Sequence, residues 1–193
     1  PMPKFTFGWT NTFRYKNFDL SVFINGSYGN KVYNYLSMKL THMNSPWTNQ
    51  LNAVNGRAQL VPINPNKVYE DGTMWYNDVS NVMVANPGAS IPRATINDPN
   101  DNDRISDRYI EDGSYIRLKN ISLGYTFPKK TIDKLGLSNL RIYANIQNLL
   151  TITGYDGYDP EIGASTSSVN VYGLDNGRYP SPTVYSFGLN VSF

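Results

Sequence analysis

Residues 114–128 read SYIRLKNISLGYTFP, and this stretch decides the fold. Its second half alternates apolar with small or polar residues, which is the period of a strand whose two faces differ. The apolar members are Ile121, Leu123, Tyr125 and Phe127. Ile116 and Leu118 lie in the opposite phase, and a β-bulge near Lys119–Asn120 would return them to the apolar face. The stretch therefore predicts a long strand over about 114–127, interrupted by one bulge.

Four further segments alternate in the same way, at about residues 4–15, 18–28, 139–148 and 184–193. The predicted strands run about 10 to 14 residues, which suits a tilted membrane strand better than the roughly 5 to 6 residues usual in soluble sheets. Short connections at 16–17 and 128–138 alternate with long ones at 29–113 and 149–182. Outer-membrane barrels have this alternation of short periplasmic turns and longer extracellular loops.

The predicted fold class is therefore all-β: an antiparallel transmembrane β-barrel, of which the chain holds the last five or so strands with two long extracellular loops. The C-terminus would then be periplasmic. Bacterial single-chain barrels have at least about eight strands, so we expect the chain to be incomplete, with the missing strands N-terminal to Pro1. Residues 1–193 are expected to be one C-terminal barrel part with no internal domain boundary and no plug domain.

The composition excludes several other classes of protein. The net charge is only +2, from 17 basic and 15 acidic residues scattered along the chain, so no basic patch for nucleic acid is expected. With no cysteine, thiolate metal sites and cysteine nucleophiles are excluded. No apolar run approaches the roughly 18 residues of a membrane-spanning helix.

Several motifs resemble the SusC/RagA family of TonB-linked outer-membrane transporters. Residues 114–128 match its "hydrophobic-R-L-K-N-hydrophobic-x-L-G-Y-T-hydrophobic-P" signature. Residues 140–150 (LRIYANIQNLL), 154–161 (GYDGYDPE), 179–180 (YP) and 187–193 (FGLNVSF) follow as in that family. The early stretches 13–20 and 29–31 look like its preceding hairpin, whereas residues 35–97 match only loosely.

The resemblance implies a barrel of about 22 strands with a plugged lumen. It further implies import of glycans or peptides with energy from TonB, contacted through an N-terminal part absent here, and pairing with a SusD-like surface lipoprotein. No enzymatic activity is expected, because no convergent set of acid, base, nucleophile or metal can be named. A soluble β-sandwich that binds glycans through aromatic loops is the alternative.

On the barrel interpretation, the apolar member of each alternation faces outer-membrane lipid and the opposite face lines the lumen. The predicted lipid-facing residues are Phe5, Phe7, Trp9, Leu20, Val22, Leu123, Tyr125, Leu140, Ile142, Phe187, Leu189 and Val191. The last strand also resembles the assembly signal that the outer-membrane insertion machinery reads, carried by Phe187, Val191 and Phe193, with Phe193 as a docking residue. Alternatively, Phe193 belongs only to the aromatic girdle at the interface.

Aromatic and acidic residues in the long loops are the candidates for binding an oligosaccharide or peptide, because rings stack on ligand faces and carboxylates contact polar groups. These candidates are Trp47, Trp75, Tyr76, Asp101, Asp103, Tyr155, Tyr158, Tyr172 and Tyr179. The alternative for each aromatic residue is that it packs one loop segment against another, which is the reading we favour for any single one.

No cofactor is expected, and calcium is the one weak alternative. Asp98, Asp101 and Asp103 could offer oxygen ligands, but the segment lacks the glycine and glutamate of a calcium-binding EF-hand loop. His42 is the only histidine and has no second histidine or cysteine to complete a zinc site. A solvated loop is therefore the favoured reading of this segment.

Overall fold

The computed structural model describes residues 1–98, 100–161 and 172–193. The chain forms two compact units, one of residues 1–34 and 110–193 and the other of residues 35–109. The second unit lies within the connection 29–113, which the sequence presents simply as a long loop. The treatment of residues 1–193 as one part without an internal boundary stays a prediction.

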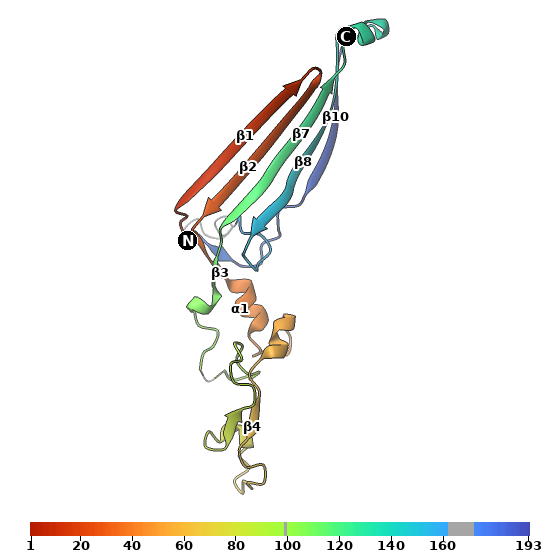
Figure 1. The fold of residues 1–193 in the computed structure, drawn as a ribbon. Coiled ribbons are helices and arrows are strands. Elements are labelled where there is room, and N and C mark those ends of the chain that lie inside the picture. Colours follow the sequence, from red (N-terminus) through yellow and green to blue (C-terminus); the bar gives the residue numbers. More distant parts are fainter. Residues whose placement is uncertain (99, 162–171) are drawn as a thin grey trace. The chain divides into compact units, whose positions relative to one another are not determined.

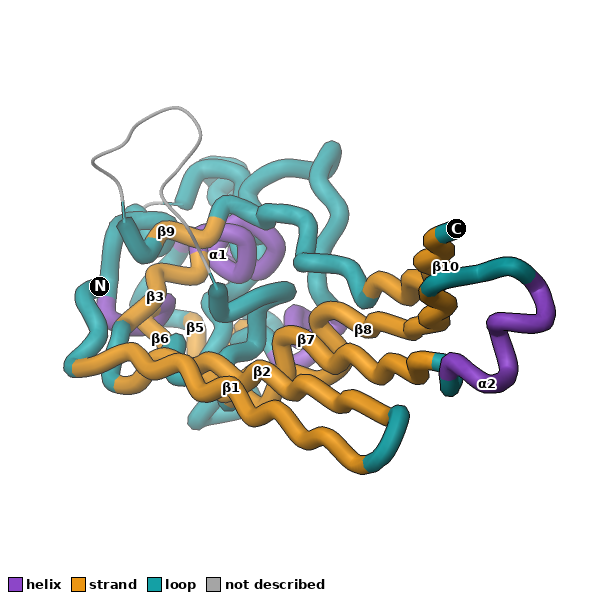
Figure 2. The backbone as a smooth tube through the Cα atoms, turned by 90° about the horizontal axis from the view of Figure 1, so that it is seen from above, coloured by secondary structure: helices purple, strands orange, loops and turns teal. Residues whose placement is uncertain are grey.

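The first unit is built on a five-stranded sheet in which every neighbouring pair is antiparallel. Its strands are β1 (Phe5–Tyr15), β2 (Phe18–Tyr28), β7 (Tyr115–Thr126), β8 (Asn139–Thr153) and β10 (Val184–Ser192). They follow one another across the sheet in sequence order (Figure 1). Viewed from above, they form one layer of adjacent strands (Figure 2). The predicted antiparallel all-β fold is confirmed, with strands of the expected length.

The predicted bulge is present at Lys119. β2 runs on without a break from Phe23 to Ile24, while its partners on β7 jump from Asn120 to Leu118. The same shift reaches β8, where Leu118 pairs with Leu150 and Asn120 with Gln147. The sequence predicts that the strand beginning at residue 139 ends at about residue 148, which is too early for β8. Asn148 and Leu149 interrupt the alternation opposite the bulge, and the strand then continues to Thr153.

The register brings the apolar members of all five strands onto one face. Residues directly opposite one another in an antiparallel pair point to the same side. One such row crosses the whole sheet as Phe13, Leu20, Leu123, Ala144 and Phe187. The next row, on the other face, is Thr12, Ser21, Ser122, Asn145 and Ser186. One face is therefore almost wholly apolar and the other polar.

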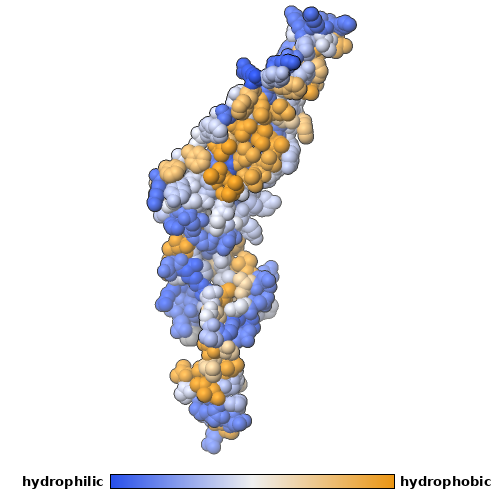
Figure 3. All heavy atoms as spheres, in the orientation of Figure 1, coloured by the Kyte–Doolittle hydropathy of each residue, from blue (hydrophilic) through white to orange (hydrophobic). Residues whose placement is uncertain are grey.

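The apolar face is not packed into a core. Leu123 is 48% exposed and Phe187 is 83% exposed, and apolar side chains gather over the sheet in Figure 3. Among the described residues, none of the buried apolar side chains comes from the five long strands; they are Val32, Met38, Ile91, Tyr109, Ile132 and Tyr155. This contradicts the soluble sandwich, which would bury its apolar face and expose the polar one. A large exposed apolar surface of this kind needs an apolar environment.

The short connections lie at one end of the sheet. The hairpin turn Lys16–Asn17, helix α2 (Lys129–Ile132) and the C-terminus share that end in Figure 1. Lys16 adopts a left-handed conformation, with φ of +53°, to make the two-residue turn. The turn after β7 continues from α2 into the 3-10 helix η4 (Asp133–Leu135) and closes with Gly136 at φ +70°. That these turns are periplasmic stays a prediction.

The long connections begin with short strands at the other end. β3 (Lys31–Asn34) pairs antiparallel with β6 (Ile110–Asp112) and parallel with β9 (Leu174–Asp175). Val32, at 1% exposed, anchors this small sheet. Both long loops are therefore joined through β3 where they leave the large sheet.

The second unit has little regular structure. It contains α1 (Tyr35–Thr41), η1 (Asn52–Gly56), the hairpin of β4 (Leu60–Pro62) and β5 (Val82–Val84), η2 (Trp75–Asn77) and η3 (Asp107–Tyr109). Met38, Ile91 and Tyr109 are its buried apolar side chains. Throughout the described part of the chain, no helix has the length and apolar character needed to cross a membrane.

The two faces can be tested with neighbouring residues in the full-length protein. Leu123→Arg should reduce folded protein in the outer membrane, since arginine on the lipid face of a barrel costs up to about 4 kcal/mol. Ser122→Arg, one residue away on the polar face, should leave it near the wild-type amount. Heat-modifiable mobility on gels measures the folded fraction. Equal losses in the two variants would contradict a lipid-facing apolar surface.

Candidate functional site

An ion-pair network on the polar face of the sheet holds the second long loop. Arg117 of β7 is only 3% exposed, and its Nε donates to Thr151 Oγ1 of β8 at 2.8 Å. Its Nη1 pairs with Glu161 at 2.6 Å and its Nη2 with Asp159. Lys119, at the bulge, pairs with Glu161 at 2.7 Å. The loop segment that follows β8 is therefore fixed against the sheet by one buried guanidinium.

Asp159 also accepts two backbone hydrogen bonds within the connection between β8 and β10. Its Oδ2 accepts the backbone N–H of Ser181 at 3.0 Å, and its Oδ1 accepts that of Glu161 at 2.9 Å. Burial alone would raise the pKa of this carboxyl group. The N–H of Ser181 and the guanidinium of Arg117 outweigh that effect, so the pKa of Asp159 lies below its ordinary value. The carboxylate stays ionised and ties both ends of the loop to Arg117.

Tyr155 belongs to the packing of the loops. It is 6% exposed, and its hydroxyl donates to Asp175 Oδ2 of β9 at 2.5 Å. Burial, and then the neighbouring Asp175 carboxylate, raise the pKa of Tyr155 well above its ordinary value, so the hydroxyl stays protonated. Burial of its ring favours the packing role for Tyr155, and its role in binding a ligand stays a prediction.

The remaining predicted binding residues are not gathered into one place. Tyr179, 84% exposed, borders a cavity of about 610 Å³ with Lys119, Glu161 and Arg178. In the second unit, Trp75 and Tyr76 border a cavity of about 900 Å³. Trp47, Tyr158 and Tyr172 are exposed by 91%, 63% and 60% and line neither cavity. Their role in binding stays a prediction.

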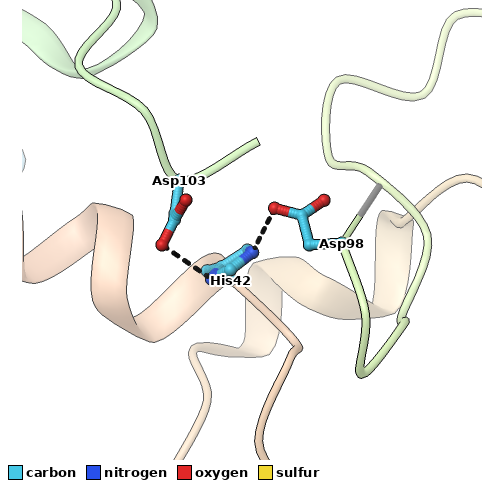
Figure 4. Close-up of side chains that lie close together, drawn as sticks. All are labelled: His42, Asp98 and Asp103. Atoms are coloured by element: carbon cyan, nitrogen blue, oxygen red, sulfur yellow. Dashed lines mark hydrogen bonds and ion pairs between the residues drawn. The ribbon is translucent and has the colours of Figure 1, made fainter. Parts of the chain in front are cut away.

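His42 lies between two carboxylates in the second unit (Figure 4). Its Nε2 is 2.9 Å from Asp98 Oδ2, and its Nδ1 is 4.0 Å from Asp103 Oδ2. Burial would raise the pKa of Asp98, but hydrogen bonds from Asn102 and His42 outweigh it and hold that pKa below its ordinary value. The residues proposed as calcium ligands are thus split: His42, and not Asp101, joins Asp98 and Asp103.

The three side chains of this cluster bond to one another and also lie close enough together to hold a metal ion. The two carboxylates approach opposite nitrogens of the ring at 2.9 and 4.0 Å, and one ligand atom from each of the three residues lies within 4.8 Å of the others. These contacts join Asp98 and Asp103 to His42, the residue that directly follows α1. Calcium binding by Asp98, Asp101 and Asp103 remains a prediction, as does the assembly role of Phe187, Val191 and Phe193. Phe193 is 94% exposed and follows the last residue of β10.

Comparison with known proteins finds relatives that are described as TonB-dependent receptors. The chain is 35% identical over 198 residues to TonB-dependent receptor P3 of Formosa agariphila, and 32% identical over 201 residues to TonB-dependent receptor P26 of the same organism. It is 29% identical over 189 residues to TonB-dependent receptor SusC of Bacteroides thetaiotaomicron. Between 96% and 100% of the chain is matched, but it spans only 15–17% of these relatives. No family model matches the chain.

Solved structures give the same fold. The RagAB peptide importer in its closed-closed state matches 100% of the chain with a TM-score of 0.66 at 20% identity. Its open-open state also gives 0.66, at 19% identity. The match covers 17% of the importer chain in each case. The fold of the chain is therefore similar to that of part of this importer.

The buried guanidinium of Arg117 can be compared with the half-buried Lys119 near it. Arg117→Ala should release the loop that follows β8, because removing one partner of a buried ion pair costs about 3–5 kcal/mol. Lys119→Ala should have a small effect, since a partly exposed pair contributes about 1 kcal/mol or less. Limited trypsin digestion of the folded full-length protein would report release as faster cleavage after Arg178.

The expected order is a several-fold faster cleavage in Arg117→Ala and a near wild-type rate in Lys119→Ala. In the wild type, docking should weaken in acid. The pKa of Asp159 is depressed in the folded state, so its contribution is complete above its ordinary pKa and is lost as the pH falls through the folded value. Equal cleavage of both variants would show that Arg117 does not hold the loop.

Proposed function

The chain is SusC/RagA-like along its whole length, and from this premise we propose that it forms part of the wall and the external loops of a TonB-dependent importer in the bacterial outer membrane. The observation that carries the proposal is the two-faced sheet. Five long antiparallel strands present an exposed apolar face on one side and a polar face on the other. A transmembrane barrel needs this division between lipid and lumen.

The roles of the parts follow from the same proposal. The apolar face would contact outer-membrane lipid, and the polar face with Arg117 would line the lumen. The short turns and the C-terminus would be periplasmic, and both long loops extracellular. TonB would act through a part of the receptor outside this chain. The relatives are receptors, which supports transport over catalysis.

The imported ligand would be an oligosaccharide or a peptide, and a SusD-like surface lipoprotein would bind over the external loops. RagAB is a peptide importer, which supports the peptide, whereas exposed loop aromatics such as Trp47 and Tyr76 support stacking on sugar rings. Long barrel loops carry the exposed recognition surface. The second unit, residues 35–109, therefore supplies much of the surface that would meet ligand and lipoprotein.

Removing most of that unit tests the proposal. The N–H of Thr95 donates to the carbonyl of Met43 at 3.1 Å, so residues 45 and 93 can be joined after deletion of 46–92 without moving the flanking chain far. In the full-length receptor this deletion should leave barrel assembly intact and reduce lipoprotein co-purification and ligand uptake at least about tenfold, or about 1.4 kcal/mol.

Two controls make the test specific. Leu135→Ser, at a position 68% exposed in η4 and outside the deleted unit, should behave like the wild type. Uptake of the wild type should stop when TonB is removed. Unchanged uptake and lipoprotein binding after the deletion would reject the recognition role of the unit. Uptake independent of TonB would reject the proposed transport itself.

A further inference from the structure

The cavity of about 900 Å³ in the second unit is built by three segments. Residues 57–60 run beside the segment that leads into residues 93–97, because Arg57 and Ile91 form a parallel bridge and the N–H of Ala58 donates to the carbonyl of Ile91 at 2.8 Å. Helix η2 supplies the third wall. This volume lies within the range of about 300–1,000 Å³ typical of small-ligand sites.

The charge of the lining is entirely positive. Arg57 and Arg93 are the charged side chains among the lining residues, and neither forms an ion pair within the described part of the chain. Arg57 donates only to a neutral group, the carbonyl of Val54, at 3.3 Å. Both side chains are half-buried. Because a guanidinium stays protonated at any physiological pH, the cavity holds two positive charges with no balancing anion.

Nearby carboxylates are engaged elsewhere. Asp78, which follows η2, pairs with Lys67 at 2.6 Å and accepts the hydroxyl of Tyr69 at 2.9 Å. Asp98, which follows the segment 93–97, is bonded to His42. Neither is left to neutralise the two arginines. An anion from outside the chain would therefore gain charge-assisted hydrogen bonds without displacing an existing partner.

The rest of the lining is suited to rings that carry hydroxyl groups. Trp75 and Tyr76 border the cavity with their rings 5.7 Å apart and nearly perpendicular, at 80°. Flat aromatic faces stack on the apolar faces of ligand rings. Amides of Gln59, Asn77 and Asn97 also line the cavity and can both donate and accept hydrogen bonds.

We propose that this cavity binds an acidic oligosaccharide, with Arg57 and Arg93 holding a carboxylate or sulfate group and Trp75 and Tyr76 contacting the sugar ring. The inference rests on the proposed import function and names the ligand class that the loop unit selects. An acidic peptide shares the anionic chemistry and can also bond with the amides, so the stacking of sugar rings on Trp75 and Tyr76 is what favours the oligosaccharide.

Binding to purified full-length receptor tests the inference. The probes are oligogalacturonate for a carboxylate, a sulfated carrageenan oligosaccharide for a sulfate ester, maltohexaose as the neutral ligand, and an acidic hexapeptide. At least one acidic oligosaccharide should bind tenfold or more tighter than maltohexaose, by an approximate threshold of 1.4 kcal/mol. Its affinity should fall as salt is raised, since ions screen the partly exposed charges.

Matched arginine variants locate the binding. Arg57→Gln together with Arg93→Gln should weaken acidic-ligand binding at least tenfold and remove most of its salt dependence, and Arg57→Lys with Arg93→Lys should restore part of the affinity. Trp75→Ala should weaken binding of the acidic oligosaccharide more than binding of the hexapeptide. Arg104→Gln, an exposed arginine of the same unit outside the cavity, is the control and should bind like the wild type.

Each other result overturns the inference. Equal affinity for maltohexaose, unchanged binding in the double glutamine variant, or preference for the hexapeptide would reject an acidic-oligosaccharide site. Heat-modifiability of every variant separates lost binding from lost folding, and failure of the lysine pair to restore any affinity counts against the charge argument. If none of the acidic oligosaccharides binds but another ligand is still taken up with the help of TonB, only this inference fails. If the wild-type receptor takes up its ligand without TonB, the proposed function fails as well.

Discussion

The two-residue period of a β-strand constrains everything else in the sheet. A slip of one residue in any strand would move its whole apolar set to the opposite face. The signature strand contains such a slip, because Ile116 and Leu118 are out of phase with Ile121 and Leu123. The bulge at Lys119 cancels it, and β8 makes the matching adjustment at Asn148, which takes a φ of +52°. One backbone irregularity, shared by two strands, keeps the apolar face continuous.

The same irregularity determines what stands on the polar face. Because the phase changes at Lys119, Arg117 falls on the polar side and reaches Asp159 and Glu161. Without the bulge, a guanidinium would point to the apolar side, where burial without partners is costly. Correct phasing of the strand and docking of the loop therefore depend on the same feature. This links the residues of the large sheet to Asp159 and Glu161 of the loop that follows β8.

The strands of the large sheet could be predicted from the sequence because each one shows its own two-residue alternation of apolar and polar residues. The five strands, the hairpin at Lys16–Asn17 and the bulge could all be predicted from local patterns. The loops could not, because their contacts join residues far apart in the chain. Arg57 meets the segment of Arg93 only through the fold, and His42 finds Asp98 at a separation of 56 residues.

Some sequence features of the loops were noticed but led to a different interpretation. The acidic residues between 98 and 103 suggested oxygen ligands for calcium. In the structure, Asp98 and Asp103 lie beside His42, which the sequence alone gave no reason to place there. The loop aromatics were chosen by residue type alone, and burial then divided them into the structural Tyr155 and the accessible Tyr76 and Tyr179. Burial in an irregular loop has no periodic signature in the sequence, so this division required the structure.

The hydrogen bond from Thr95 to Met43 has a consequence for how such chains diversify. It brings the two ends of the intervening segment together at a fixed point, and the entropy of closing a loop grows only slowly with its length. Insertions, deletions or wholesale exchange of residues between these two positions therefore cost the flanking structure little. The segment between Met43 and Thr95 is therefore a place where the chain can accept new sequence while the five-stranded sheet stays the same.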